Sequence, residues 1–562
     1  MIRPLLLAAS LVAALPAYAR ENAGAYLAGR AAQIENDFEA TSRYLAEALQ
    51  DDSLNPMMME TLVGAYISLL EMDAAEDVAT DLTQAEVQSQ IAALALFAVP
   101  AKARNWADIL NEFDAGLTVA PLFDGVVRAF ALLGDGRVEE ALAQLQAVQN
   151  APGTRAFGVY YSALALAQLG RFDEAATLLD EEDELRLTRR GVRAQAEILS
   201  NVGRNDDARA VLLEETSGNL DETLNAIAAR LDAGETLPLT IAPDPQAAIA
   251  EIAFDIANTI VGETAPSYAL LYTRIAEYLR PGHPEASLLS ALLLEDMQQY
   301  DLAIETYGRV PTDDVTYVTA QLGRAEVMRE AGRAEAGIDA IRALAEDFPN
   351  NALIHITLGD ALREDGAYAE AEAAYNDAVA LFEGDSAAQW IVYFARAIVR
   401  ERQDDWDAAE DDFQKALELS PGRATVLNYL GYSLIERQER LDEALVMIQE
   451  AVAAAPNSGP IVDSLGWAFY RLGRYAEAVE PMERAVELMP VDPVVNDHLG
   501  DVLWAVGREL EARFQWQRAL SFVENDENEE VDPDRIRRKL EVGLDAVLEE
   551  EGAPPLRMAD GG

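Results

Sequence analysis

Small and apolar residues recur through the second half of the chain at an interval of about 34 residues. The pattern is clearest where Leu465-Gly466, Ala478 and Ala485 are followed one interval later by Leu499-Gly500, Ala512 and Ala519. Counting in both directions gives eight units, which begin at residues 250, 284, 318, 352, 390, 424, 459 and 493. A period of this length predicts pairs of helices stacked as a solenoid, whereas an ordinary helical bundle has no need of it.

Two places in each unit hold a small residue, as expected where two helix backbones approach closely. The eighth place is occupied by Ala257, Ala291, Ala325, Gly359, Ala397, Gly431, Gly466 and Gly500. The twentieth place is occupied by Ala269, Ala303, Gly337, Ala371, Ala409, Ala444, Ala478 and Ala512. Proline follows the second helix of several units, for example at Pro421 and Pro456, because it cannot continue a helical turn.

This pattern resembles the tetratricopeptide repeat (TPR), and the resemblance covers most of the chain after residue 20. It implies an all-α fold: a right-handed superhelical solenoid of helix–turn–helix repeats, built as one array or as two sub-arrays. We assign eight repeats to residues 250–526. A more degenerate N-terminal array is assigned to residues 20–223, with units that begin near 22, 56, 88, 122, 156 and 189.

Other segments interrupt or end the arrays. Residues 224–249 break the rhythm, and the prolines between Leu237 and Pro245 prevent a continuous helix, so we expect a linker or hinge there. Residues 527–550 are expected to form a capping helix that covers the last apolar face of the solenoid. Residues 551–562 are expected to be a disordered tail.

Residues 1–19 have the features of a secretory signal peptide. Arg3 provides the positive end, Leu5 to Leu15 form an apolar run, and Ala17-Tyr18-Ala19 is a cleavage site with small outer residues. The apolar run is too short to span a bilayer, which requires about 20 apolar residues. We therefore expect cleavage near Ala19 and export to a bacterial periplasm.

Composition argues against several classes of partner and site. The net charge of −56 repels nucleic acid and anionic lipid head groups, so membrane association is expected only through partners. Because the chain has no cysteine, it cannot form disulfides, thiolate metal sites or a lipidated amino terminus. The three histidines, His283, His355 and His498, are too scattered for a clustered metal site, and no cofactor is expected.

No catalytic signature stands out in the sequence. Asp404-Asp405 and Asp411-Asp412 could form a divalent-cation site, but a solvated helix face beside the core residues Trp406 and Phe413 is the favoured interpretation. His355 is expected to be buried with its hydrogen bonds satisfied, and His283, in a turn, to be exposed.

In TPR proteins, the first helix of each unit lines the inner face at places 2, 5, 9, 12 and 13. In the last three full units this predicts a partner-binding groove formed by Asn428, Tyr432, Asp463, Trp467, Tyr470, Arg471, Asp497, Asp501 and Trp504. Aromatic rings with polar neighbours suit a bound peptide, although the same rings could simply pack against the next unit. The lysine-and-arginine clamp of chaperone-binding TPRs is missing, so a basic or neutral partner fits better.

The carboxy-terminal block carries a sharper resemblance. Its motifs, in order, are Asn428-Tyr-Leu-Gly-Tyr432, Leu441-Asp-Glu-Ala444, Asp463-Ser-Leu-Gly-Trp-Ala-Phe-Tyr470, His498-Leu-Gly-Asp-Val-Leu-Trp504 and Arg513-Phe-Gln-Trp516. This string resembles the envelope TPR proteins of proteobacteria, including the LbcA-type adaptor of a periplasmic carboxyl-terminal processing protease. The resemblance implies a solenoid that wraps the protease and presents substrates, notably peptidoglycan hydrolases. That adaptor is a lipoprotein, whereas this chain has no cysteine to acylate.

The leading hypothesis is therefore a non-enzymatic periplasmic adaptor that binds partner proteins on the inner face of the solenoid. The alternative is a structural scaffold of an envelope assembly or export complex. An adaptor should exchange its partners, whereas a scaffold should remain in a large stable complex.

Overall fold

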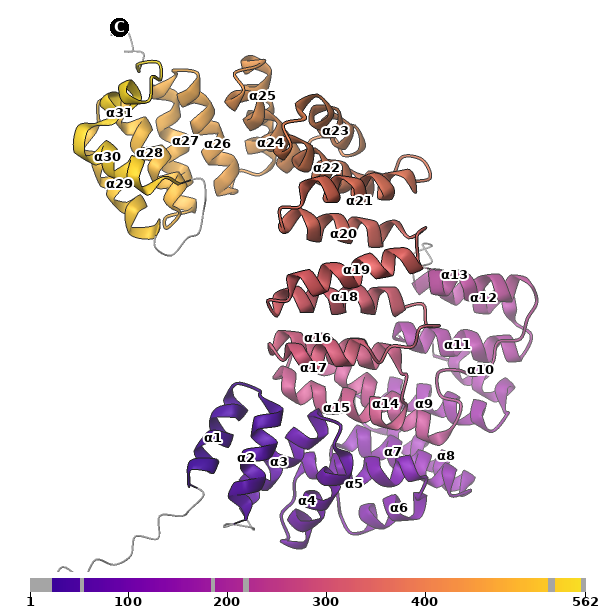
Figure 1. Ribbon diagram of the computed structural model, residues 1–562. Coiled ribbons are helices and arrows are strands. Elements are labelled where there is room, and N and C mark those ends of the chain that lie inside the picture. Colours follow the sequence, from indigo (N-terminus) through magenta and orange to yellow (C-terminus); the bar gives the residue numbers. More distant parts are fainter. Residues whose placement is uncertain (1–22, 51–54, 183–186, 216–221, 524–530, 557–562) are drawn as a thin grey trace, which may run out of the picture. The chain divides into compact units, whose positions relative to one another are not determined.

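The computed structural model describes residues 23–50, 55–182, 187–215, 222–523 and 531–556 (Figure 1). The predicted signal peptide, residues 1–19, lies outside these ranges. Within them, the regular elements are the α-helices α1 to α31 and one short 3₁₀ helix, η1 (Ala387–Gln389). The predicted all-α fold is confirmed. The chain divides into two compact units, Met1–Leu344 (unit 1) and Ala345–Gly562 (unit 2).

The N-terminal array consists of the first helices of unit 1. They are α1 (Ala23–Ile34), α2 (Phe38–Leu49), α3 (Pro56–Ser68), α4 (Met72–Gln84), α5 (Gln90–Ala103), α6 (Trp106–Asp114), α7 (Pro121–Gly134), α8 (Val138–Asn150), α9 (Arg155–Gln168), α10 (Phe172–Asp180), α11 (Arg189–Asn201), α12 (Asn205–Glu215) and α13 (Glu222–Asp232). The odd-numbered helices α1 to α11 begin within two residues of the predicted unit starts.

Local chemistry explains where these helices begin and end. Asn55 accepts a hydrogen bond from the backbone N–H of Met58 and precedes Pro56 at the first position of α3, where proline costs no hydrogen bond. The turn inside a pair needs a left-handed residue, and Gly473, at φ 72°, provides it. The N–H of Arg474 then donates to the carbonyl oxygen of Phe469 at 2.8 Å, which closes the helix end.

The segment after α13 differs from its prediction. Residues 237–244 are not helical, as expected, but they are packed inside unit 1, with Leu237 and Ile241 buried. Arg280 donates to the carbonyl oxygens of Thr240 and Ile241, at 2.9 and 2.6 Å. Because these contacts hold the segment against the rest of unit 1, the expected boundary between two arrays at residues 224–249 is wrong. The chain divides about a hundred residues later, inside α19 (Ala334–Asp347).

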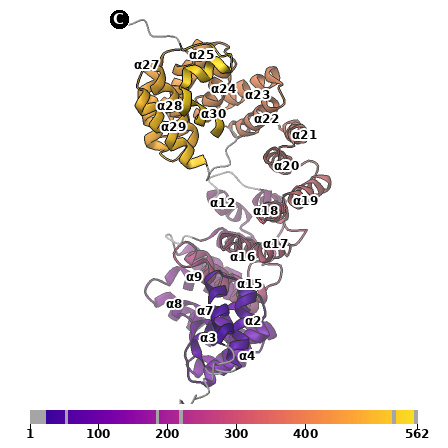
Figure 2. The same ribbon diagram turned by 60° about the vertical axis from the view of Figure 1, so that its left-hand side comes forward.

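The helices α14 (Pro245–Ile260) and α15 (Pro266–Leu279), here called the α14–α15 hairpin, pack against the first helices of the N-terminal array (Figures 1 and 2). The hairpin contacts α3, α5, α7 and α9, and we call the side of these helices that it covers the inner face of the N-terminal array. Apolar residues surround α5, so it needs cover on more than one side. The hairpin provides that cover.

The remaining helices of unit 1 are α16 (Pro284–Asp296), α17 (Tyr300–Tyr307), α18 (Tyr317–Glu330) and most of α19. The repeats predicted to start at 250, 284 and 318 therefore belong to unit 1. The first of these repeats is the α14–α15 hairpin, which covers the inner face of the N-terminal array. The eight predicted repeats therefore do not form one separate array.

Unit 2 contains the remaining repeats, whose first helices begin at intervals of 34 to 38 residues. Its helices up to the cap are α20 (Ala352–Glu364), α21 (Tyr368–Ala380), α22 (Trp390–Arg402), α23 (Trp406–Leu419), α24 (Ala424–Glu436), α25 (Leu441–Ala454), α26 (Gly459–Arg471), α27 (Tyr475–Leu488), α28 (Pro493–Ala505) and α29 (Glu509–Val523). All five first helices begin at the predicted residue. Close packing explains the glycine at the eighth place: a Cβ on Gly500 would lie 2.4 Å from the ring of Trp516.

The cap consists of two helices, α30 (Pro533–Val542) and α31 (Leu544–Glu550), rather than the one expected over 527–550, of which 527–530 lie outside the described ranges. Gly543 separates them because its φ of 88° is not helical, and a Cβ there would lie 2.5 Å from Trp504. The expectation of a disordered tail is wrong for residues 551–556. Glu551 pairs with Arg535 at 2.7 Å and Leu556 packs on the core of unit 2. Residues 557–562 lie outside the described ranges.

Candidate protein-binding groove

A groove with a volume of about 500 Å³, here called the unit 2 groove, crosses the first helices α22, α24, α26 and α28. Its polar and aromatic lining consists of Glu401, Arg402, Asn428, Tyr429, Tyr432, Ser433, Glu436, Arg437, Asp463, Ser464, Asp492 and His498. Its apolar lining consists of Pro460, Met489, Val494 and Val495. First helices of successive repeats thus bring their inner places into one surface.

Three of the nine predicted residues, Asn428, Tyr432 and Asp463, line the unit 2 groove. Asn428 and Tyr432 are half-buried one turn apart on α24, at the fifth and ninth places of the unit. The Oδ1 atom of Asn428 has no hydrogen-bond partner among the described residues. The groove therefore contains an amide with an unused acceptor beside an aromatic ring.

Trp467, Tyr470 and Arg471 lie beside the groove and connect neighbouring repeats. The ring of Trp467 stacks on Tyr470, with centroids 4.7 Å apart, and on His498 of the next repeat, 4.0 Å away. Its Nε1–H donates to Glu436 at 2.9 Å, and Arg471 pairs with the same carboxylate at 3.2 Å. These three residues therefore brace the repeats that carry the groove lining, which agrees with the packing alternative left open by the sequence.

His498 and Asp463 form a charged pair on the groove surface. The Nδ1 atom of His498 is 3.0 Å from Oδ2 of Asp463. Burial lowers the pKa of His498, but the Asp463 carboxylate outweighs burial and raises it above the ordinary histidine value. The groove thus carries a histidine that favours its charged form.

The last three predicted residues, Asp497, Asp501 and Trp504, are covered by the cap. The ammonium group of Lys539, from α30, is fully buried and lies 2.8 Å from Asp497 and 2.7 Å from Asp501. Trp504 donates its Nε1–H to Asp545 of α31 at 2.9 Å. The prediction that these three residues line the groove is wrong, because α30 and α31 occupy the position that the first helix of another repeat would take.

Several residues of the groove were not predicted from the sequence. Glu436 occupies the thirteenth place of its unit, which the counting rule includes, and Arg402 occupies the same place in the unit before the three considered. Tyr429 and His498 occupy the sixth place, which the rule omits. Arg437 lies just after α24 and stacks on Trp406, with its guanidinium carbon 4.7 Å from the ring centroid.

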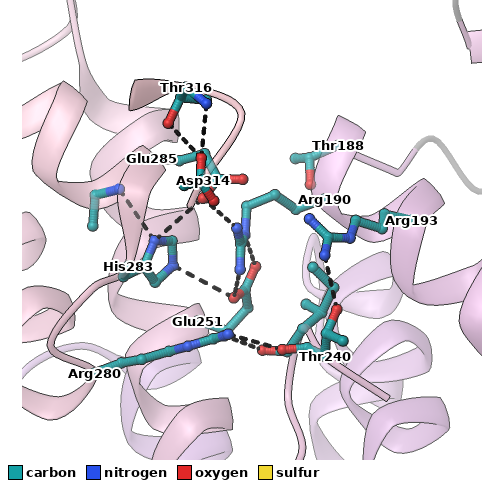
Figure 3. A network of polar contacts seen from close by, with 12 residues as sticks. Thr188, Arg190, Arg193, Thr240, Glu251, Arg280, His283, Glu285, Asp314 and Thr316 are labelled. Atoms are coloured by element: carbon teal, nitrogen blue, oxygen red, sulfur yellow. Dashed lines mark hydrogen bonds and ion pairs between the residues drawn. The ribbon is translucent and has the colours of Figure 1, made fainter. Parts of the chain in front are cut away.

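A second set of polar side chains lies buried in unit 1, where α11, α14 and the turn before α16 meet (Figure 3). Arg190 of α11 donates two hydrogen bonds to Glu251 of α14, at 2.6 and 2.8 Å, and pairs with Glu285 at 2.6 Å. Burial raises the pKa of Glu251, but Arg190 and His283 together outweigh burial and lower this pKa to about 2. Glu251 is therefore an ionised, fully buried carboxylate.

The histidines and acidic pairs singled out in the sequence are placed as follows. His283 was expected to be exposed but is fully buried, 3.7 Å from Glu251, because the turn that contains it is pressed against α14. His355 is buried and bonded to the carbonyl oxygen of Pro349 at 3.0 Å, as predicted. Asp412 was expected on a solvated face but is buried against Arg396, 2.7 Å away.

Two features are absent from the described ranges. No three His, Asp or Glu side chains come together there in a way that could hold a metal ion. None of the described helices combines the length and apolar character required to cross a membrane.

Two family models of the tetratricopeptide repeat match unit 2, one over residues 349–422 and the other over residues 387–524. The chain contains tetratricopeptide repeats. TPR arrays typically present extended surfaces to partner proteins rather than catalysing reactions. A TPR repeat-containing protein of Pseudomonas aeruginosa is 27% identical over 188 residues, which are 33% of this chain and 31% of that protein. The chain thus matches about a third of the length of this curated relative.

Solved structures of TPR proteins are also similar. A chain in the crystal structure of the APC/C hetero-tetramer Cut9–Hcn1 is 14% identical, with 93% of this chain and 96% of that chain covered and a TM-score of 0.37. Yeast Tom70 is 13% identical, with 95% and 96% covered and a TM-score of 0.35. YrrB, described as a TPR protein with an unusual peptide-binding site, is 21% identical, with 33% and 93% covered and a TM-score of 0.27.

Proposed function

We propose that this TPR protein is a non-enzymatic adaptor that holds a segment of a partner protein in the unit 2 groove. The observation that carries the proposal is the groove itself. It is a cavity of about 500 Å³ in which Asn428, Tyr432 and Asp463, from two successive repeats, meet on one surface. The inner face of the N-terminal array is filled by the α14–α15 hairpin, so unit 2 offers the better site.

The lining indicates the chemistry of the bound segment. Tyr429 and Tyr432 provide rigid rings that bury area at little entropic cost, and the amide of Asn428 can bond a peptide backbone. Four carboxylates line the groove, those of Glu401, Glu436, Asp463 and Asp492, against two arginines and a histidine. With a chain net charge of −56, this favours a neutral or basic segment.

The features of residues 1–19 support a periplasmic location, with membrane association only through partners. The resemblance of the carboxy-terminal block supports one class of partner, a carboxyl-terminal processing protease together with its substrates. A stable scaffold in an envelope complex is the alternative, and the two differ in how fast the bound protein exchanges.

The test is calorimetric titration of the purified chain, from residue 20 onward, with the carboxyl-terminal processing protease of the same bacterium. We expect binding, and we expect Asn428→Ala with Tyr432→Ala to weaken it at least tenfold, about 1.4 kcal/mol, since two central contacts are lost. Gln449→Ala, exposed on α25, is the matched control.

Equal affinity of the double variant and the control would exclude the groove as the binding surface. Absence of binding by the native chain would exclude the protease as partner. A complex that never exchanges labelled for unlabelled protein would favour the scaffold. Circular dichroism of each variant establishes that the helices are intact.

A further inference from the structure

The α14–α15 hairpin brings two carboxylates into the interior of unit 1. Glu251 and Asp255 are four residues apart on α14, so they lie on the same face of the helix. Glu251 is 0% exposed and Asp255 is 5% exposed. Two like charges at this spacing, both removed from water, cannot remain ionised unless each is compensated.

Only Glu251 has such compensation. The guanidinium of Arg190 is bonded to both of its oxygens, and the ring of His283 lies 3.7 Å away. Among the described residues, the carboxyl group of Asp255 receives one hydrogen bond, from the hydroxyl of Tyr161 on α9, at 2.6 Å. A single neutral donor does not offset the burial of a negative charge, so charge counting alone favours protonated Asp255.

The surroundings of Asp255 point the same way. Burial, followed by the adjacent Glu251 charge, raises the pKa of Asp255 to about 7, while Tyr161 and Arg190 lower it less. The elements packed around this site contribute these titratable side chains: Tyr160 and Tyr161 from α9, Arg190 and Glu197 from α11, Glu251 from α14, and His283 and Glu285 from the start of α16. From α7, Phe130 stands edge-on to Tyr161.

Asp255 also lies where the hairpin contacts the inner face of the N-terminal array. Tyr161, its hydrogen-bond donor, is fully buried on α9, one of the first helices that form the inner face of the N-terminal array. The hairpin has further attachments: Arg274 donates to the carbonyl oxygen of Ser68 at 3.0 Å, and Lys102 to that of Leu279 at 3.4 Å. The inner face is therefore a surface that binds helices, with the hairpin as its occupant.

We propose that a proton on Asp255 holds the α14–α15 hairpin on the inner face of the N-terminal array, and that loss of this proton with rising pH loosens the hairpin. The pKa of Asp255 is raised from 3.8 when exposed to about 7 in the docked state. Asp255 therefore favours the docked state fully below pH 3.8, and this stabilisation is lost progressively as the pH rises to about 7. Acidification therefore stabilises the docked hairpin, and a rise to neutral pH makes its opening more favourable.

His283 acts in the opposite direction. Burial lowers its pKa, so the docked state favours the neutral ring, and the stability that His283 contributes is lost as the pH falls below about 6.5. The test must therefore compare two proteins that share His283. Asp255→Asn keeps the shape and an acceptor for Tyr161, and it removes only the titration of residue 255.

The experiment is hydrogen–deuterium exchange with mass spectrometry on the full chain at pH 5 and pH 8, with rates corrected for intrinsic exchange. Peptides of α14 and α15 report the opening constant of the hairpin. The quantity compared is the opening constant of the native protein divided by that of Asp255→Asn. This ratio is expected to rise about a hundredfold from pH 5 to pH 8, because the pKa of Asp255 is about 7 in the docked hairpin and 3.8 when the residue is exposed. Asp339→Asn, exposed in the middle of α19, should follow the native protein.

A ratio that does not change with pH would overturn the proposal. Infrared spectroscopy gives an independent measurement: at pH 6 the native protein should show a protonated carboxyl band that Asp255→Asn lacks, and its absence would also overturn the proposal. If Asp255→Asn does not fold, Tyr161→Phe serves instead. Loss of the donor to the carboxylate should shift the opening transition to higher pH, and an unshifted transition would refute the assignment.

Discussion

Replacement of Lys539 by methionine would test how the cap is attached to unit 2. Lys539 is 0% exposed, and its Nζ atom lies 2.8 and 2.9 Å from the oxygens of Asp497 and 2.7 and 2.8 Å from those of Asp501. Methionine fills nearly the same volume without the charge. The change therefore removes the ammonium group and leaves both carboxylates in place.

The expected cost follows from burial. Asp501 is 2% exposed and also accepts a hydrogen bond from Trp516 at 2.9 Å, so it cannot turn to solvent without breaking that bond. Burial, together with the Asp501 charge, raises the pKa of Asp497 even with Lys539 present. Removing one partner of a buried ion pair costs about 3–5 kcal/mol, and we expect Lys539→Met to destabilise unit 2 by this amount.

The assay is urea unfolding followed by tryptophan fluorescence. Five of the six tryptophans lie after residue 345 and only Trp106 before it, so the signal reports mainly on unit 2. Lys415→Met is the matched control, because Lys415 lies in the same unit with its ion pairs to Asp385 and Glu418 at the surface. Its unfolding midpoint should stay near that of the native protein.

Equal midpoints for the two lysine variants would show that the buried ion pairs of Lys539 do not stabilise unit 2. A second comparison separates unpaired charge from lost packing. Adding Asp497→Asn and Asp501→Asn to Lys539→Met should recover part of the stability, since no charge is then left unpaired. No recovery would mean that the cost lies in packing alone.

Two further changes have expected outcomes in thermal or urea unfolding. Gly500→Ala should destabilise unit 2 by about 1–3 kcal/mol, because the added Cβ would lie 2.4 Å from the fully buried ring of Trp516. The control is Gly64→Ala, which should be neutral or slightly stabilising because the nearest atom to its added Cβ is 3.8 Å away. Arg190→Met should destabilise unit 1 by about 3–5 kcal/mol in unfolding followed by circular dichroism, and adding Glu251→Gln should restore part of this loss; no loss from the single change would contradict the role given to the pair.

The fold could be predicted from the sequence to the extent that its contacts are local. Each repeat packs mainly on the next, about 34 residues away, so small residues such as Gly466 and Gly500 recur in register and mark the helices. The docking of the α14–α15 hairpin on α3, α5 and α9 joins segments about 90 to 210 residues apart, and no periodic pattern signals it. The apolar character of α5 on all sides was the one available clue.

The groove was predictable in part for a similar reason. Asn428, Tyr432 and Asp463 follow from counting places in a repeat, since the same places face the same side in every unit. Asp497 and Asp501 obey the same count but are covered by Lys539, whose helix lies after residues 524–530 and outside the repeat pattern. The counting rule cannot show where an array ends, so it fails at the last repeat.

Site-specific photocrosslinking in living cells would show whether the unit 2 groove binds a partner protein. A photoreactive phenylalanine analogue is placed at Tyr432, which lines the groove, or at Gln449, exposed on α25. If the groove binds a partner, we expect a covalent adduct at position 432 that maps to one segment of one partner and decreases when Asn428 is changed to alanine. Absence of an adduct at 432, or equal adducts at 432 and 449, would contradict it.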